Sequence, residues 1–290
     1  MLDGILKAIE DWMRELLTGM VTSNLETMYT DVNERTGMIA SEVAKTPQAW
    51  NGSIYGIIHN LSDTVMMPIA GMIITFVLCY ELVFLLTEKN SMHEMDTWMF
   101  FKYFVKMWIA VYVVSHTFDI TMAVFDVGQH IVSAASGVIS GDTAIDIEEM
   151  KTLFSQQAED MGIGELFVLV LESFVVSLGM KIISILITVI LYVRMVEIYL
   201  YISVAPVTFA TLGNREWGQI GNNYLRGLFA LAFQGFFILV CVGIYGVLVA
   251  TVQFSDNLHL ALFEVAGYAV ILCFSLMRTG SMAKQVFNAH

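Results

Sequence analysis

Long apolar segments constrain this chain more than any other feature of its sequence. Gly227–Ser255 carries no charged residue, and a helix needs about 20 apolar residues to cross the hydrocarbon core of a bilayer. Over the whole chain, 57% of the residues are hydrophobic and 14% are charged, whereas a soluble domain carries about 25% charged residues. With a mean hydropathy of +0.70, the sequence predicts an all-α, polytopic membrane protein.

Several segments are apolar enough to enter a membrane, and they predict about five or six transmembrane helices. These segments are Thr64–Thr87, Trp98–Phe125, Leu166–Val193, Ile198–Asn214, Gly227–Ser255 and Asn257–Met277. Trp98–Phe125 is the poorest candidate among them, because it contains Lys102, Lys106 and Asp119.

The segment Ile198–Asn214 is short and has Ala205-Pro206 at its centre. Proline lacks the amide hydrogen that a helix uses and clashes with the preceding turn, and it pushes Ala205 towards extended geometry. Backbone groups freed in this way survive at membrane depth only against protein or water. The sequence therefore predicts one broken or re-entrant segment here, with a complete, proline-kinked span as the alternative.

Polar regions divide the chain into an arm, a membrane domain and a tail. Residues 1–21 place apolar residues at helical spacing, which predicts an amphipathic helix lying on the membrane surface or packed against protein. This start is acidic from Asp3 onward, unlike that of a signal peptide. Residues 22–60 are polar with weak helical character. We expect an extracytoplasmic arm over residues 1–60, a transmembrane domain over 61–280 with an acidic outer loop over 128–165, and a cytoplasmic tail over 281–290.

Charge distribution predicts a multi-pass protein of the plasma membrane with its N-terminus outside. Lysine and arginine concentrate in short cytoplasmic loops, so both long acidic regions should lie outside and the loop 88–106 inside. Lys102 and Lys106 then share one helical face and can snorkel to cytoplasmic headgroups. If Ile198–Asn214 enters and returns, the chain crosses about five times and its C-terminus lies in the cytoplasm.

Charged residues inside membrane segments are candidates for function, because they are costly to keep there. Lys181 lies in the middle of an apolar segment and should pair with a carboxylate such as Glu81 or Glu172. Glu172 is too far along the same helix for a local pair, so pairing would need another helix or another subunit. Arg194 and Glu197 are three positions apart and can pair locally.

The sequence shows no pattern of a catalytic, cofactor or metal site. No two of the six histidines stand at metal-ligand spacing in one element, and no nucleophile, phosphate-loop or dinucleotide motif occurs in the right setting. The net charge of −13, without a basic cluster, argues against a nucleic-acid-binding surface. We therefore expect a protein that is not an enzyme and binds no cofactor.

The stretch Leu191–Val249 resembles the characteristic region of the TrbL/VirB-six family, the polytopic inner-membrane subunits of type IV secretion systems. The form that it resembles is carried by conjugative elements of Gram-positive bacteria. The matching features are Arg194 before an apolar segment, Ala205-Pro206 within it, Trp217 after it, and a second long apolar helix. The amphipathic start and the acidic central region also agree with the family plan.

The resemblance implies a core membrane component of a DNA-transfer apparatus. Such subunits form a homo-oligomeric ring, contact other secretion subunits and transfer ATPases, and help to build the translocation channel or an assembly platform. For the matching residues, local arguments predict that Arg194 holds the cytoplasmic end of a helix, that Pro206 sets a break, and that Trp217 anchors at the headgroups. The alternative for these residues is scaffold geometry without substrate contact. Whether nucleic acid touches the subunit stays open.

The competing hypothesis is a stand-alone secondary transporter or a channel for a small solute. A broken segment and buried charges occur in such proteins too. A transporter built from inverted repeats should, however, have two broken segments in corresponding halves. The sequence offers one, because Pro68 lies near the start of its helix.

Overall fold

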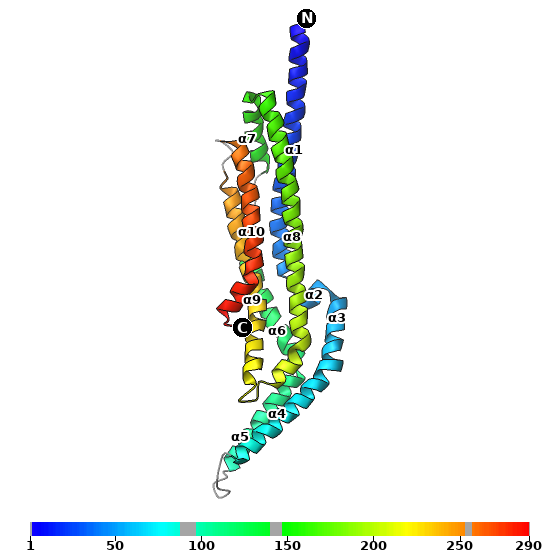
Figure 1. Ribbon diagram of the computed structural model, residues 1–290, viewed down its shortest axis with the longest axis vertical. Coiled ribbons are helices and arrows are strands. Elements are labelled where there is room, and N and C mark those ends of the chain that lie inside the picture. Colours follow the sequence, from blue (N-terminus) through cyan, green and yellow to red (C-terminus); the bar gives the residue numbers. More distant parts are fainter. Residues whose placement is uncertain (1, 88–96, 140–146, 253–256, 290) are drawn as a thin grey trace. The chain divides into compact units, whose positions relative to one another are not determined.

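The protein is helical throughout the residues that its structure describes. The computed structural model describes residues 2–87, 97–139, 147–252 and 257–289, and within them it contains helices and no strand (Figure 1). In chain order the elements are α1 (Leu2–Val43), α2 (Pro47–Trp50), α3 (Gly52–Leu61), the π-helix η1 (Ser62–Met66), α4 (Met67–Thr87), α5 (Thr97–Ser115), α6 (Thr117–Ile139), α7 (Ile147–Asp160), α8 (Ile163–Ala210), α9 (Gly218–Ala250) and α10 (Leu258–Val286). Six helical stretches in the described residues are long and apolar enough to cross a membrane. The predicted all-α, polytopic membrane fold is thus confirmed.

The chain forms two compact units, each assembled from three stretches of sequence. Unit 1 contains Met1–Val43, Val132–Leu191 and Phe237–Arg278. Unit 2 contains Ala44–Ile131, Tyr192–Phe236 and Thr279–His290. Unit 1 therefore holds α1 and α7, and unit 2 holds α2 to α5, while the longer helices contribute residues to both. The expected arm, membrane domain and tail, with boundaries at residues 60 and 280, remain a prediction.

In unit 1, α1 is a single helix of 42 residues. Its apolar positions recur every three or four residues, and this stripe is buried from Leu17 onward. The buried members are Leu17, Val21, Leu25, Met28, Tyr29, Val32, Ile39 and Val43. The expectation of weak helical character for residues 22–43 is therefore wrong, because polar residues on the opposite face obscured the period. Before Leu17, the apolar residues Ile5, Leu6 and Ile9 are exposed.

Polar contacts fix α1 against α7 within unit 1. The guanidinium of Arg14 donates to three carbonyls at the end of α7, those of Ala158, Glu159 and Met161, over 2.6 to 3.1 Å. A cation at this place satisfies carbonyls that lack partners within the helix and complements the helix dipole. On the same pair of helices, Lys151 contacts Glu26 at 3.0 Å. Its hydrogen bonds to Glu26 and then Glu148 raise the pKa of Lys151 above its ordinary value.

In unit 2 the core gathers around the last part of α8. Ile198, Ile202 and Phe209 are buried there against residues of α4, α6 and α9, such as Ile74 and Leu228. Helices α6 and α9 approach closely at a glycine. A Cβ atom on Gly128 would lie 2.9 Å from the carbonyl oxygen of Ala232 and 3.0 Å from its Cβ atom. Only a residue without a side chain fits this crossing.

The sequence analysis expected Ile198–Asn214 to be separate from the preceding apolar segment and to be broken at Pro206. Both expectations are wrong. Helix α8 runs without interruption from Ile163 to Ala210, through Arg194 and with Pro206 inside it. The polar residues Arg194 and Glu197 lower the hydropathy but do not end a helix, since neither is a helix breaker. Pro206 lies four residues before the end of α8, so the helix loses one backbone hydrogen bond and continues. Helix α9 follows after a turn, so Ile198–Ala210 is the end of a long helix, not a re-entrant segment.

Two further segments have structural detail that the sequence did not indicate. Trp98–Phe125 does not form one uniform helix: α5 ends at Ser115 and α6 begins at Thr117, although backbone hydrogen bonds to the carbonyls of Tyr112 and His116 continue the helical pattern across the junction. The acidic region 128–165 is largely helical, since α6 extends to Ile139 and α7 covers Ile147–Asp160. Apolar positions such as Met150 and Phe154 are buried on one face of α7.

Candidate functional site

A turn held by several polar contacts connects α8 to α9 in unit 2. Thr211–Trp217 separates the two helices. The buried side chain of Asn214 accepts hydrogen bonds from the backbone N–H groups of Glu216 at 2.7 Å and Trp217 at 2.9 Å. The backbone carbonyl of Asn214 accepts the N–H of Gly218 at 2.9 Å. An asparagine in this position caps the first turn of the following helix, so the sequence fixes where α9 begins.

A buried carboxylate ties this turn to the α4–α5 pair. The side chain of Glu81 on α4 is only 8% exposed. One of its oxygens accepts a hydrogen bond from Lys106 Nζ on α5 at 3.0 Å, and the other accepts the backbone N–H of Arg215 at 3.0 Å. Three chain segments therefore meet at one side chain. A carboxylate with a cation on one oxygen and an N–H donor on the other is a stable arrangement in a poorly hydrated setting.

Aromatic contacts extend the same junction, which we call the Glu81 latch. Trp217 stacks on Phe76 of α4 with ring centroids 5.6 Å apart, and the guanidinium of Arg215 lies 4.8 Å from the ring centre of Phe84. Tyr80 donates its hydroxyl hydrogen to Glu216 at 2.9 Å. The turn is thus held against α4 along two turns of that helix. Trp217 remains 41% exposed, and a headgroup anchor at this position stays a prediction.

The proline of α8 lies against protein. Ala205 is fully buried, and the hydroxyl of Thr208 donates to its carbonyl at 2.9 Å. Gly221 of α9 lies against this part of α8, because a Cβ atom there would lie 2.8 Å from the carbonyl oxygen of Thr208. The expectation of a helix break at Pro206 is wrong, but this stretch is an interior feature of unit 2.

Arg194 and Glu197 do not form the expected local pair. Glu197 instead accepts a hydrogen bond from Lys284 of α10 at 2.8 Å. The side chain of Arg194 is 6% exposed, and within the described part of the chain its buried Nε atom has no hydrogen-bond partner. Arg194 also lies well inside α8, so it does not stand at the end of a helix as the sequence analysis expected.

The two other candidate charges of α8 belong to unit 1. Glu172 contacts His259 of α10, so its partner does lie on another helix, but that partner is not Lys181. The side chain of Lys181 is exposed, and among the described residues it makes no ion pair. The expected pairing of Lys181 with Glu81 or Glu172 therefore stays a prediction.

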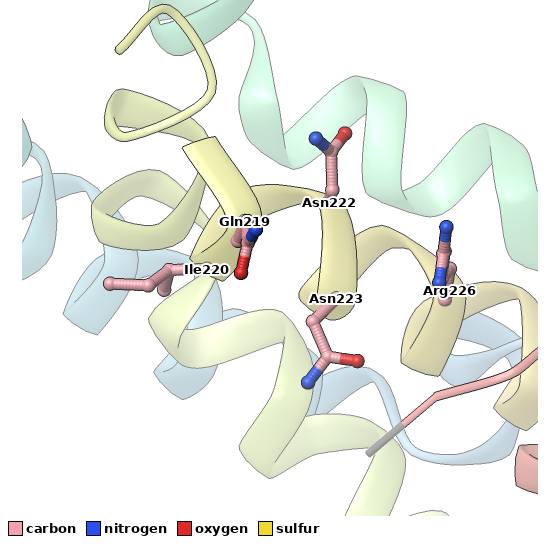
Figure 2. A pocket seen from close by; sticks show the side chains of 5 residues that line it. All are labelled: Gln219, Ile220, Asn222, Asn223 and Arg226. Atoms are coloured by element: carbon pink, nitrogen blue, oxygen red, sulfur yellow. The ribbon is translucent and has the colours of Figure 1, made fainter. Parts of the chain in front are cut away.

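The first turns of α9 also line a hollow of about 630 Å³. Its walls are Gln219, Ile220, Asn222, Asn223 and Arg226 (Figure 2). Asn222 and Arg226 are four residues apart and point the same way, and Asn223 points to the opposite side (Figure 2). Arg226 also donates to the backbone carbonyl of Asn288 at 3.3 Å. These groups offer amides and one cation, but no nucleophile and no acid–base pair.

The described residues contain no group of three or more histidine, cysteine, aspartate or glutamate side chains that could hold a metal ion. The Glu81 latch joins charged and aromatic groups to a backbone turn, which is an arrangement for positioning helices.

Sequence comparison decides the family. The sequence model described as "TrbL/VirB6 plasmid conjugal transfer like protein" matches residues 32–206, more than half of the chain. The chain belongs to the TrbL/VirB6-like conjugal transfer family. This family consists of structural membrane components and is not known as a family of enzymes. The match includes Glu81, Arg194 and Pro206, and it ends before Trp217. No curated protein and no solved structure gave a match.

The family and the six apolar helical stretches indicate a multi-pass membrane protein that associates with other components of a conjugal transfer system.

Sequence analysis identified Glu81, Glu197, Pro206 and Trp217, but it missed Asn214 and the pairing of Glu81 with Lys106. The helix-capping preference of asparagine, three residues before Trp217, was the available signal for the turn.

Proposed function

We propose that this TrbL/VirB6-like protein is a core integral-membrane subunit of a conjugative type IV secretion system. In this proposal, several copies assemble, with the other secretion subunits and the transfer ATPases, into part of the translocation channel or of the platform on which it is built. Family membership supports the role in conjugation. The oligomeric assembly is supported by charged side chains that are exposed on helices of membrane-spanning composition.

Examples are Lys181 on α8 and two acidic residues on α6, Asp119 and Asp126. All three side chains are exposed. Lys181 lies among exposed apolar residues of α8 such as Leu178, Ile182 and Ile185. A charge at the centre of a membrane helix costs about 2.5–3.5 kcal/mol if it faces lipid. Such side chains therefore face another copy, another subunit or a hydrated path.

We expect Lys181→Leu to weaken self-association of the protein by about tenfold or more, which corresponds to about 1.4 kcal/mol. The substitution removes one partner of an intersubunit charge contact and leaves the other unpaired. The measurement is the distribution of oligomers of the purified, full-length protein, by native mass spectrometry and crosslinking in membranes. Lys181→Arg is the matched control and should keep the assembly. An unchanged oligomer distribution in Lys181→Leu, with a higher melting temperature, would show that Lys181 faces lipid.

The orientation that we propose places the α8–α9 turn in the cytoplasm. Lys102 and Lys106 lie at the same end of unit 2 as Arg215 of the turn, because Glu81 contacts both Lys106 and the backbone of Arg215. Basic residues near short connections favour the cytoplasmic side. The acidic α7, and α1 which packs on it, then lie outside, with the N-terminus outside and the C-terminus in the cytoplasm.

Labelling of single cysteines tests this orientation. In a variant without Cys79, Cys241 and Cys273, we expect Gln156→Cys on α7 to react with a membrane-impermeant thiol reagent in intact cells. Asn222→Cys on α9 should react only after permeabilisation. Both side chains are exposed, so access depends on the side of the membrane alone. The reverse pattern would overturn the orientation.

Deletion and complementation test the function itself. In a donor cell whose conjugative element encodes this protein, deletion should abolish DNA transfer, and the wild-type chain should restore it. Solute uptake by the purified protein in liposomes, together with normal transfer by the deletion strain, would instead support a stand-alone transporter or channel.

A further inference from the structure

A groove of about 450 Å³ runs along α5 beside the end of α8 in unit 2. Its lining residues are Lys102, Val105, Lys106, Ile109, Ala110, Val113, Phe209, Leu212 and Gly213. The two lysines occupy one end of the α5 wall, and every other lining residue is apolar or glycine. The groove therefore separates a cationic end from an apolar floor.

The length of the groove corresponds to one leaflet of a bilayer. Lys102 and Val113 are eleven positions apart on α5, which is about 16 Å along a helix. Half of the hydrocarbon core is about 15 Å thick. If the lysines lie at the level of the headgroups, the apolar floor reaches about the middle of the bilayer.

The charges at the cationic end match a single anionic group. Lys106 is neutralised by Glu81 at 3.0 Å, whereas the Lys102 ammonium lies 5.7 Å from the ring centre of Trp98 and contacts no carboxylate among the described residues. The end of the groove thus keeps about one unit of positive charge. Tyr103 braces the same helix by donating its hydroxyl hydrogen to the carbonyl of Leu78 at 2.8 Å, so the lysine wall is held in place.

We propose that this groove binds one diacyl phospholipid with an anionic phosphodiester headgroup, its phosphate at Lys102 and Lys106 and an acyl chain along Ile109, Ala110 and Phe209. Basic pockets between membrane helices favour such headgroups. The bound lipid would lie beside the last turn of α8 and the Glu81 latch, through Leu212 and Gly213 of the connecting turn.

Native mass spectrometry of the purified, full-length protein in detergent tests the site. Phosphatidylglycerol and phosphatidylcholine with identical acyl chains are titrated in parallel. We expect one phosphatidylglycerol to be retained per chain in preference to phosphatidylcholine. Lys102→Gln should weaken its retention about fivefold, the equivalent of about 1 kcal/mol for one basic side chain near a membrane surface. Lys7→Gln, which removes an exposed lysine of α1, should have no effect.

Two further arms define the ligand. Ala110→Phe fills the apolar floor and should reduce retention of both lipids, and Lys102→Gln tests the site independently if that variant does not fold. Inorganic phosphate at millimolar concentration should not displace the lipid, since it cannot use the floor. Equal retention of the two lipids, equal effects of Lys102→Gln and Lys7→Gln, or complete displacement by inorganic phosphate would each overturn the proposal.

Discussion

Replacing Glu81 by leucine is expected to abolish DNA transfer and to destabilise the protein by about 2–4 kcal/mol. The substitution leaves Lys106 without its counter-ion and the backbone N–H of Arg215 without its acceptor, at a position where Glu81 itself is buried. We place the value below that of a fully buried pair because Lys106 is partly exposed. The measurements are the conjugation frequency and the thermal unfolding of the protein in detergent.

Two variants test whether the effect comes from the contacts of the Glu81 latch. The alternative is that removing any acidic side chain from a membrane helix has the same effect. Glu81→Gln keeps an acceptor for Arg215 and should lose only part of the stability. Glu264→Leu makes the same chemical change on α10, where the side chain is half-buried and makes no hydrogen bond among the described residues, so it should leave transfer intact. If Glu81→Leu melted at the wild-type temperature and transferred DNA normally, the latch would have no function.

Gly128→Ala should destabilise the protein by about 1–3 kcal/mol. Alanine in place of a helical glycine normally stabilises a helix by up to about 1 kcal/mol. At Gly128 the sign should reverse, because the added methyl group would meet the carbonyl oxygen of Ala232 at 2.9 Å. Backbone cannot move aside as a flexible side chain can, so α6 and α9 must separate. Thermal unfolding in detergent measures the effect.

Gly137 on the same helix provides the matched control. A Cβ atom on Gly137 would meet nothing within 4 Å, so Gly137→Ala should be neutral or stabilising. Gly128→Leu should be more destabilising than Gly128→Ala, because it adds further atoms at the same crossing. Equal melting temperatures for Gly128→Ala and Gly137→Ala would contradict the close approach of the two helices.

The sequence was sufficient to predict the apolar helices and the class of protein. Gly227–Ser255 lies largely within α9, and Thr64–Thr87 largely within α4, because a long uncharged segment leaves few alternatives to a membrane helix. The course of α8 was not predictable in the same way. Hydropathy falls at Arg194 and Glu197, but a helical backbone continues through polar residues. Pro206 removes one backbone hydrogen bond, but it does not end a membrane helix whose freed groups are buried against protein.

Sequence spacing did not reveal the ion pairs of the candidate site, because the two residues of each pair lie on different helices. Glu81, Glu172 and Glu197 were identified as candidates, but their partners lie 25, 87 and 87 positions away. Local spacing rules apply only within one helix. The adjacency of α4 and α5 in the chain was the available signal for Glu81, since consecutive helices joined by a short connection usually pack together.

Helix α8 also limits how much of its surface can touch lipid. Exposed apolar side chains follow it from Phe167 to Val204, which is about 56 Å of helix at 1.5 Å per residue. The hydrocarbon core is about 30 Å thick, and even a tilt of about 40° allows only about 39 Å of contact. The remaining exposed apolar side chains of α8 therefore lie outside the hydrocarbon core. In water such a surface would aggregate, so we expect other polypeptides to cover it once the protein is assembled.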